Sequence, residues 1–283
     1  MNKLIVFLKL IDIGHTLFAL PFAYMGAFLA AAGWPSGHEL IWITVAMVSA
    51  RTSALGLNRI IDRQIDARNT RTAHWPLASG QISVAAIGAA VGIGLVLLFY
   101  AASQLNPLCL KLSPIAVLAL ALYSFTKRFT WTCHFFLGFT IAVGPLGAWL
   151  AVTPQLTASI VLLYVGVGVW VAGFDTVYAC QDIDFDRTEH LYSIPSRFGI
   201  GGALQIAKWL HAITVIMLLG VGLFEGLGWA YYVGVVLVAG LLGRAHYLVR
   251  GNDLSHVNLA AFGLNRYVGM IMFLATVLSL WMR

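Results

Sequence analysis

Charged residues are scarce in this chain. Lysine, arginine, aspartate and glutamate make up 10% of its 283 residues, whereas they make up roughly a quarter of an ordinary soluble domain. Hydrophobic residues reach 60% and gather in runs long enough for membrane helices of about 20 residues. These runs lack the alternating pattern of an outer-membrane barrel. The composition therefore excludes a soluble domain and predicts an all-α, polytopic membrane bundle.

Cysteine is also scarce. Cys109, Cys133 and Cys180 lie in or beside apolar runs without metal-ligand spacing, so we interpret them as small core residues. The net charge is +6, but the basic residues are spread between hydrophobic runs, so nucleic acid is not an expected partner. The lipid bilayer is the expected surrounding, and no segment indicates an obligate protein partner.

We expect about nine membrane helices in a single domain that spans residues 1–283. Their approximate ranges are 11–32, 39–62, 84–102, 108–128, 133–152, 156–182, 203–223, 228–247 and 262–282. Two long polar loops are expected between them, at about 66–81 and 185–202. These loops are the places where a cap over a pocket can form.

Lysine and arginine indicate the orientation, because they are enriched in cytoplasmic loops. With a cytoplasmic N-terminus, the inside segments hold Lys3, Lys9, Arg59, Arg63, Arg68, Arg71, Lys127, Arg128, Arg187, Arg197, Lys208, Arg244 and Arg250. Only Lys111 and Arg283 fall outside, and Arg266 lies near the edge. We therefore expect a cytoplasmic (inner) membrane protein whose main cavity opens to the cytoplasm.

Two rows of oxygen-bearing side chains end two of the expected helices. Asn58, Asp62 and Asp66 are four residues apart, so on an α-helix they form one slowly drifting stripe. Asp182 and Asp186 repeat this spacing. Carboxylates at the C-terminal end of a helix lie against its dipole, and Mg²⁺ takes one or two carboxylates together with phosphate oxygens. We predict that these five residues hold Mg²⁺ against a diphosphate, with nearby arginine and lysine neutralising it.

Arg51 and Asp175 lie within apolar helices, where charges are costly and usually face a cavity or a partner. We interpret both as pocket residues; the alternative is a structural pair with each other or with another polar group. Asp184 and Glu189 are interpreted as solvated. The histidines His15, His38, His134, His190, His211 and His246 lack ligand spacing and are interpreted as interfacial or hydrogen-bonded polar residues.

These motifs resemble those of the UbiA superfamily of intramembrane prenyltransferases. Its first signature, NxxxDxxxD followed by RT, is matched by Asn58, Asp62, Asp66, Arg71 and Thr72. Its second, YA followed by DxxxD, is matched by Tyr178, Ala179, Asp182 and Asp186. Its YSxxKR element is matched by Tyr123, Ser124, Lys127 and Arg128. The HTLFALPFA, GPLGAWLAVT and SIPSRFG segments resemble the bacterial 4-hydroxybenzoate polyprenyltransferase branch, which includes relatives in the futalosine route to menaquinone.

The resemblance implies Mg²⁺-dependent transfer of a polyprenyl group from its diphosphate to a small aromatic acceptor in ubiquinone or menaquinone biosynthesis. The residues expected to bind the substrates are Arg51, Asn58, Arg63, Arg71, Tyr123, Lys127, Tyr178 and Arg197. Those expected to be catalytic are Asp62, Asp175 and Asp182. Asp175 or an acid of the second motif is expected to bind the acceptor or take its ring proton.

One residue departs from the family pattern. Trp75 stands where the family usually has an arginine, and an arginine there would help to bind diphosphate. Arg63, Arg68 or Arg197 is the expected substitute for it.

Other functions remain open from the sequence. Within the same class, the acceptor could be a haem, a chlorophyllide or a lipid glycerol phosphate. Buried aspartate and arginine also fit a proton-coupled transporter, although transport predicts acids near the middle of the membrane in broken helices. A non-catalytic scaffold that binds quinone or lipid is the third class.

Overall fold

The computed structural model describes the backbone of residues 13–283 and side chains from residue 19 onward, and it is all-helical over that range. Lys3, Lys9, the start of the first expected helix and the His15 side chain lie outside the described residues. The long helices are α2 (Ile13–Ala30), α3 (Gly37–Arg68), α4 (Val84–Leu105), α5 (Pro107–Thr126), α6 (Cys133–Val152), α7 (Ala158–Ala179), α9 (Ile194–Phe224), α10 (Trp229–Leu248) and α11 (Arg266–Trp281). The short ones are η1 (Cys180–Asp182), α8 (Ile183–Thr188), η2 (Arg250–Asn252) and the π-helix η3 (Leu259–Gly263).

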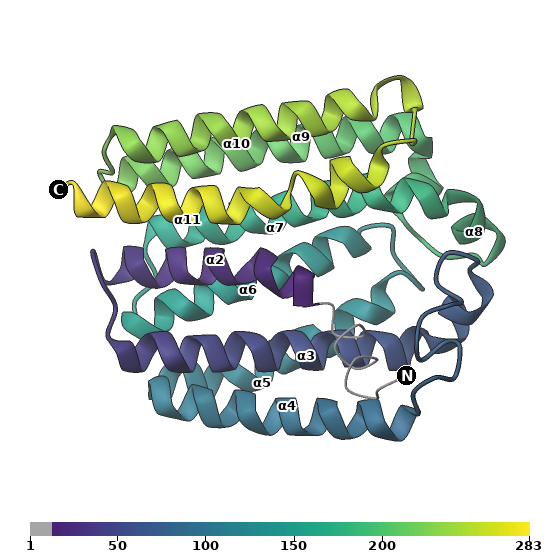
Figure 1. Cartoon of the computed structure of the whole chain (residues 1–283), viewed down its shortest axis with the longest axis horizontal. Helices are drawn as coiled ribbons and strands as arrows, with labels where there is room; N and C mark the ends of the chain where they lie inside the picture. The colour runs from purple at the N-terminus through teal and green to yellow at the C-terminus, as the bar shows by residue number, and fades with distance from the viewer. Residues whose placement is uncertain (1–12) are drawn as a thin grey trace.

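The helices run side by side (Figure 1). Within the described chain, eight helical segments are long and apolar enough to cross a membrane, and the apolar helix α2 adds another. The expectation of an all-α bundle with about nine membrane helices is therefore confirmed. The loop after α3 and the short helix α8 lie at the same end of the bundle in Figure 1.

The second expected loop is wrong over much of its length, because 185–202 contains most of α8 and the beginning of α9. Ser193 caps α9 through a hydrogen bond from the Ser196 amide, and a proline follows the cap, which are strong helix-start signals. Gly199 then adopts φ 72° and kinks the helix. Hydropathy detects only the apolar part beyond this kink, because the capped first turn is amphipathic and short.

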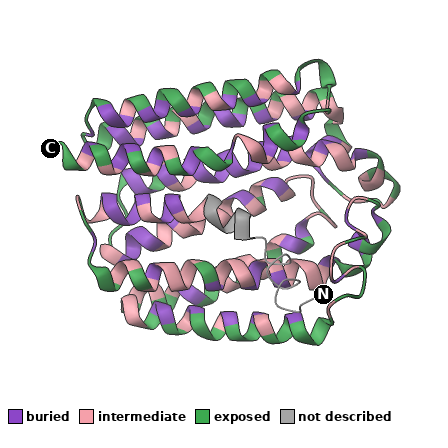
Figure 2. Cartoon of the chain, viewed as in Figure 1, coloured by how far each residue is buried: buried purple, intermediate pink, exposed green. Residues whose placement is uncertain are grey.

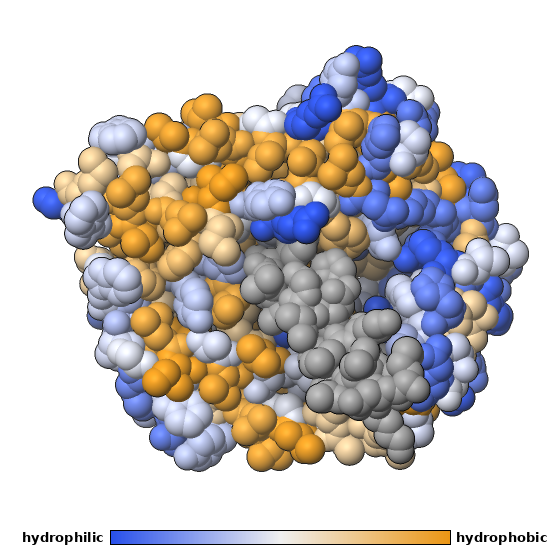
Figure 3. All heavy atoms as spheres, in the orientation of Figure 1, coloured by the Kyte–Doolittle hydropathy of each residue, from blue (hydrophilic) through white to orange (hydrophobic). Residues whose placement is uncertain are grey.

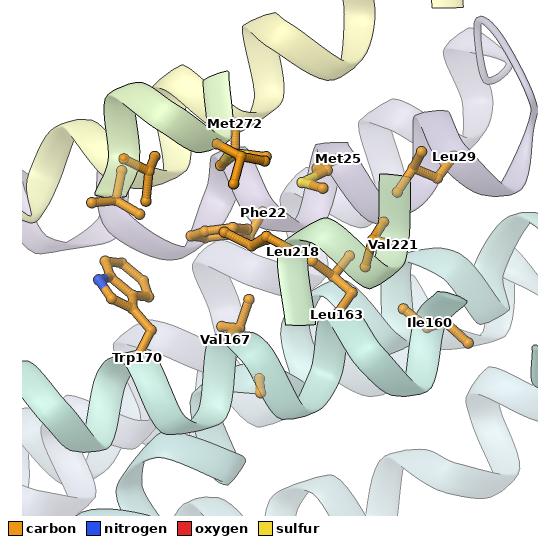
Figure 4. Close-up of a cluster of buried hydrophobic side chains, with 14 of the residues drawn as sticks. Phe22, Met25, Leu29, Ile160, Leu163, Val167, Trp170, Leu218, Val221 and Met272 are labelled. Atoms are coloured by element: carbon orange, nitrogen blue, oxygen red, sulfur yellow. The ribbon is translucent and has the colours of Figure 1, made fainter. Parts of the chain in front are cut away.

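Helix α7 is the centre of the bundle. In its most apolar stretch 72% of the residues are buried, against 11% for α5. Its neighbours are α6 and α9, and the largest core cluster joins α7 to α2, α9, α10 and α11. Figure 4 shows Phe22 of α2, Trp170 of α7 and Leu218 of α9 within this cluster.

The outer faces of the bundle are apolar, as a membrane protein requires. Figure 2 shows exposed residues along the outer helices α4 and α10, and many of them are large hydrophobic side chains, including Val96, Tyr100, Val236 and Leu237. In Figure 3 hydrophobic side chains cover much of the flank, while hydrophilic ones gather at the end that carries α8. Exposed apolar surface of this kind fits contact with lipid tails.

Helices α6 and α7 cross closely at Gly138. A Cβ atom on Gly138 would come within 2.1 Å of the backbone oxygen of Gly168, whereas one on Gly147 of the same helix would meet nothing within 4 Å. Small residues at such crossings let membrane helices approach each other. We expect Gly138→Ala to destabilise the protein by about 1–3 kcal/mol through overpacking, and Gly147→Ala to leave its stability unchanged. Melting temperatures in detergent measure both, and equal values for the two variants would contradict the prediction.

Candidate active site

A cavity of about 520 Å³ lies between the helices and is lined by residues from both acidic rows. Asn58, Asp62 and Asp66 reach it from α3, and Asp182 and Asp186 reach it from η1 and α8. Segments that are more than 110 residues apart in sequence therefore meet at one site. The prediction that the two rows face a shared pocket is confirmed. Asp184, which we interpreted as solvated, is exposed and outside the lining.

Asp62 is held by two cations. Its side chain is 3% exposed, and its oxygens lie 2.8 Å from Lys127 Nζ and 3.1 Å from Arg128 Nη2. Asn58 Nδ2 donates to the same carboxylate at 2.8 Å and to Ser124 Oγ at 3.2 Å. A buried carboxylate without such partners would cost several kcal/mol. The end of α5 therefore fixes the middle residue of the first acidic row.

Asp66 faces a cation that stacks on an aromatic ring. Arg59 Nη1 lies 3.8 Å from Asp66 Oδ2, and the Arg59 guanidinium lies 3.5 Å from the centre of the Trp75 ring. Cation-π contacts of this kind favour one position of a guanidinium. Trp75 comes from the loop after α3 and lines the cavity. Arg59 therefore stands at the cavity wall against Trp75, the residue that replaces the family's usual arginine.

Asp182 forms the shortest ion pair of the site. Arg71 Nη2 lies 2.6 Å and Arg71 Nε 2.9 Å from its two oxygens, and Asn69 Nδ2 donates to it at 3.0 Å. Arg71 Nη1 also donates to the Tyr178 hydroxyl at 2.9 Å. Burial alone would lower the pKa of Arg71, but its hydrogen bonds and attraction to Asp182 outweigh this effect and raise that pKa. Arg71 therefore stays positively charged beside Asp182 of the second row.

Asp175 and Asp186 complete the polar wall of the cavity, the part formed by the two acidic rows and the cations beside them. Asp175 Oδ2 lies 2.7 Å from His134 Nδ1, so Asp175 has a histidine partner. Asp186 Oδ2 accepts a hydrogen bond from Ser193 Oγ at 2.7 Å. Arg51 and Asp175 both line the cavity, as we expected of intramembrane charges.

The polar wall is chemically suited to Mg²⁺ with a diphosphate. Its donors are carboxylate and amide oxygens, which a hard cation prefers, and Mg²⁺ needs only one or two of them beside phosphate oxygens. Among the described side chains, no three acidic, histidine or cysteine groups form a ready-made metal cluster. Asp62, Asp66 and Asp182 each lie beside a cation. A diphosphate with bound Mg²⁺ carries both signs of charge. Its metal can pair with the acids and its phosphate oxygens with the cations, so it can replace these ion pairs.

The rest of the cavity is apolar and aromatic. Its side chains come from five elements and include Phe22, Leu137, Ile141, Val167, Trp170, Val171, Phe174 and Phe262. Successive rings lie in contact, with centres 5.2 Å apart for Phe22 and Trp170, and 5.1 Å apart for Trp170 and Phe174. Phe262 continues the series to Tyr178 at 4.5 Å, the residue that bonds Arg71. An apolar path therefore leads directly to the polar wall.

Two expected substrate-binding residues lie outside the cavity, so those predictions are wrong in position. Arg63 is exposed on α3, because one residue beyond Asp62 turns about 100° around the helix. Arg197 is also exposed, with its guanidinium 5.2 Å from the Trp131 ring. Glu189, which we expected to be solvated, pairs with Arg68 at 2.9 Å. The remaining predicted residues, including Tyr123, Lys127 and Tyr178, all line the cavity.

Arg59, His134 and Ser193 contribute to the site, although their residue types and positions were not assigned to it from the sequence. Arg59 lies seven residues before Asp66, which is about two helical turns and the same face, so spacing could have identified it. His134 and Ser193 carry no such signal, because their partners Asp175 and Asp186 belong to other elements.

Comparison with known proteins agrees with this geometry. The pattern of the UbiA prenyltransferase family matches residues 19–278. The chain belongs to this family. It is therefore a prenyltransferase, and its membrane-spanning helices make it an integral membrane protein. The transporter and scaffold hypotheses are not retained.

Individual relatives of this prenyltransferase cover most of the chain. The 4-hydroxybenzoate octaprenyltransferase of Vibrio parahaemolyticus is 31% identical over 256 residues, covering 89% of this chain and 88% of that protein. The apo structure of a UbiA homolog from Aeropyrum pernix K1 matches with a TM-score of 0.86 at 31% identity, covering 93% and 97% of the two chains. A UbiA homolog from Archaeoglobus fulgidus, solved with GPP and Mg²⁺, has the same fold, with a TM-score of 0.73 at 21% identity over 96% and 99%.

Proposed function

We propose that this prenyltransferase transfers a polyprenyl group from polyprenyl diphosphate to a small aromatic acceptor in quinone biosynthesis, using Mg²⁺. The acceptor is 4-hydroxybenzoate or a naphthoate- or futalosine-type precursor. The observation that carries the proposal is the division of one cavity into a wall of paired acids and cations and an aromatic, apolar path that ends at that wall. The similarity to 4-hydroxybenzoate octaprenyltransferases supports the choice of acceptor class.

The polar wall binds the diphosphate in this proposal. Mg²⁺ would be held by Asn58, Asp62, Asp66, Asp182 and Asp186. When bound, it would neutralise charge that grows on the leaving diphosphate. Arg59, Arg71 and Lys127 lie beside these acids and bind the remaining phosphate oxygens. Fixed charges aimed at the place where charge develops are usually the largest contribution to catalysis.

The aromatic path holds the prenyl chain and its reacting end. Cleavage of the allylic C–O bond leaves a cation, and the rings of Tyr123 and Tyr178 line the cavity beside the acids, where they can stabilise it. Arg51 binds the polar group of the acceptor, and Asp175 faces the same space and takes the ring proton. One cavity therefore supports both halves of the reaction.

We also propose that the acidic end of the bundle faces the cytoplasm, with the protein in the inner membrane and the N-terminus inside. The uneven distribution of lysine and arginine supports this orientation.

One experiment tests the proposed reaction. Membranes containing the protein are supplied with Mg²⁺, one polyprenyl diphosphate and, separately, 4-hydroxybenzoate, a dihydroxynaphthoate, an aminofutalosine-type acceptor, a haem, a chlorophyllide and a glycerol phosphate lipid. Mass spectrometry is expected to show prenylation of an aromatic acid. Prenylation of only a haem, a chlorophyllide or a lipid would contradict the proposal.

Trp75 contributes to diphosphate binding through Arg59. We expect Trp75→Ala to raise the KM for polyprenyl diphosphate about threefold to tenfold, since it removes a cation-π contact worth about 0.5–2 kcal/mol. Trp75→Phe keeps a ring under the guanidinium and should change this KM less. Initial rates at varied polyprenyl diphosphate concentrations measure the effect. An unchanged KM in Trp75→Ala would show that Arg59 needs no aromatic support.

A further inference from the structure

A buried histidine is hydrogen-bonded to the acid that we assign to the acceptor. The His134 side chain is 4% exposed and the Asp175 side chain 24%, and Nδ1 of the first lies 2.7 Å from Oδ2 of the second. His134 comes from the first turn of α6, and Asp175 from α7. Both line the cavity. A polar contact this short between two helices orients the carboxylate toward one side of the pocket.

The backbone fixes the proton on this histidine. The amide of Ile194 lies 3.3 Å from His134 Nε2, and an amide N–H can only donate. Nε2 must therefore accept, so the proton of the neutral ring is assigned to Nδ1, from which it points at Asp175. The ring thus donates a hydrogen bond to Oδ2, while Oδ1 is left to meet a ligand in the cavity.

The start of α9 also contacts an acid of the second motif. Ile194 follows Ser193, whose Oγ donates to Asp186 at 2.7 Å. The first turn of α9 therefore contacts His134 on one side and an acid of the second motif on the other. This arrangement sets the spacing between the acceptor acid and the metal-binding acids through a few rigid backbone atoms.

We propose that His134 is a positioning residue for removal of the acceptor's ring proton, an inference that rests on the proposed function. The allylic C–O bond breaks and its electron pair leaves with the diphosphate. A C–C bond then forms to the ring, the ring C–H electron pair restores aromaticity, and the proton goes to Asp175 Oδ1. His134 aims the carboxylate by donating from Nδ1 to Oδ2, as an orienting partner does for a catalytic base.

Kinetic isotope effects test this role directly. The variants His134→Ala and His134→Gln are assayed with the aromatic acceptor that the panel identifies, either unlabelled or deuterated at the ring position that is prenylated. We expect His134→Ala to lower kcat about tenfold or more, to leave the KM for polyprenyl diphosphate unchanged, and to show a primary isotope effect. His134→Gln should recover most of kcat, because its amide can donate to Asp175 and accept from Ile194.

A second buried histidine serves as the control. His211 is 3% exposed, bonds His246 at 2.9 Å and lies outside the cavity lining, so His211→Gln should leave kcat and the isotope effect as in the wild type. Wild-type kcat in His134→Ala, or a lower kcat without an isotope effect, would overturn the positioning role while the proposed function stands. If the wild type prenylates no aromatic acceptor, the proposed function fails and this inference fails with it.

Discussion

Asp62→Ala and Asp182→Ala are each expected to abolish prenyl transfer, with a loss of about 10³-fold or more, which is the scale seen when electrostatic support of developing charge is removed. Each substitution removes oxygen ligands from one acidic row. Each also leaves cations without their acid: Lys127 and Arg128 around Asp62, and Arg71 around Asp182. Product formation in membranes at saturating substrates and Mg²⁺ measures the loss.

Matched variants separate catalysis from folding. Asp62→Asn and Asp182→Asn keep the shape of the side chain and should still lose most activity, since the charge that holds the metal is gone. Asp184→Ala changes an exposed acid next to the second row and outside the cavity, and should retain activity. The amount of inserted protein is measured for each variant. Wild-type activity in Asp62→Ala or Asp182→Ala at normal insertion would remove the metal-diphosphate site.

Withdrawal of divalent metal is expected to have an equally large effect. With EDTA in excess, prenyl transfer should fall below detection, because the diphosphate then meets five carboxylates of the cavity without a metal to bridge them. Added Mg²⁺ should restore the full rate. The measurement is the initial rate as a function of free Mg²⁺ concentration.

The dependence on metal concentration adds a sharper criterion. Asp66→Asn keeps one row partly intact and should raise the Mg²⁺ concentration needed for half-maximal rate, whereas Asp184→Asn should leave it unchanged. Full activity in EDTA would contradict the proposal of Mg²⁺-dependent transfer. A Mg²⁺ requirement that is identical in Asp66→Asn and the wild type would remove Asp66 from the metal ligands.

Most of the fold was predictable because membrane helices leave a strong local signal. Backbone groups in lipid must be bonded within the segment, so long apolar runs indicate helices with little ambiguity. The errors fall where polar segments fold by capping and tertiary contact, as at the start of α9 around Ser193 and Gly199. Hydropathy does not detect such segments, although the serine cap and the following proline are helix-start signals in the sequence.

The site was predictable where its residues share one helix and unpredictable where they do not. Spacing alone placed Asn58, Asp62 and Asp66 on one face. Arg63 was misplaced because it was chosen for its charge, without regard to the turn of the helix. His134 was interpreted as a satisfied polar residue, which is correct, but its partner Asp175 lies 41 residues away on another helix.

By itself, the sequence determined that this protein is a helical membrane protein with two rows of oxygen-bearing side chains, since hydropathy and four-residue spacing are local properties that do not depend on how the helices pack. Only the tertiary structure decided that Lys127 stands beside Asp62 and Arg71 beside Asp182, because these pairs join the end of α5 to α3 and the loop after α3 to η1. It also decided that Trp75 supports Arg59 and that His134 orients Asp175, as both depend on distances between elements that no sequence pattern encodes.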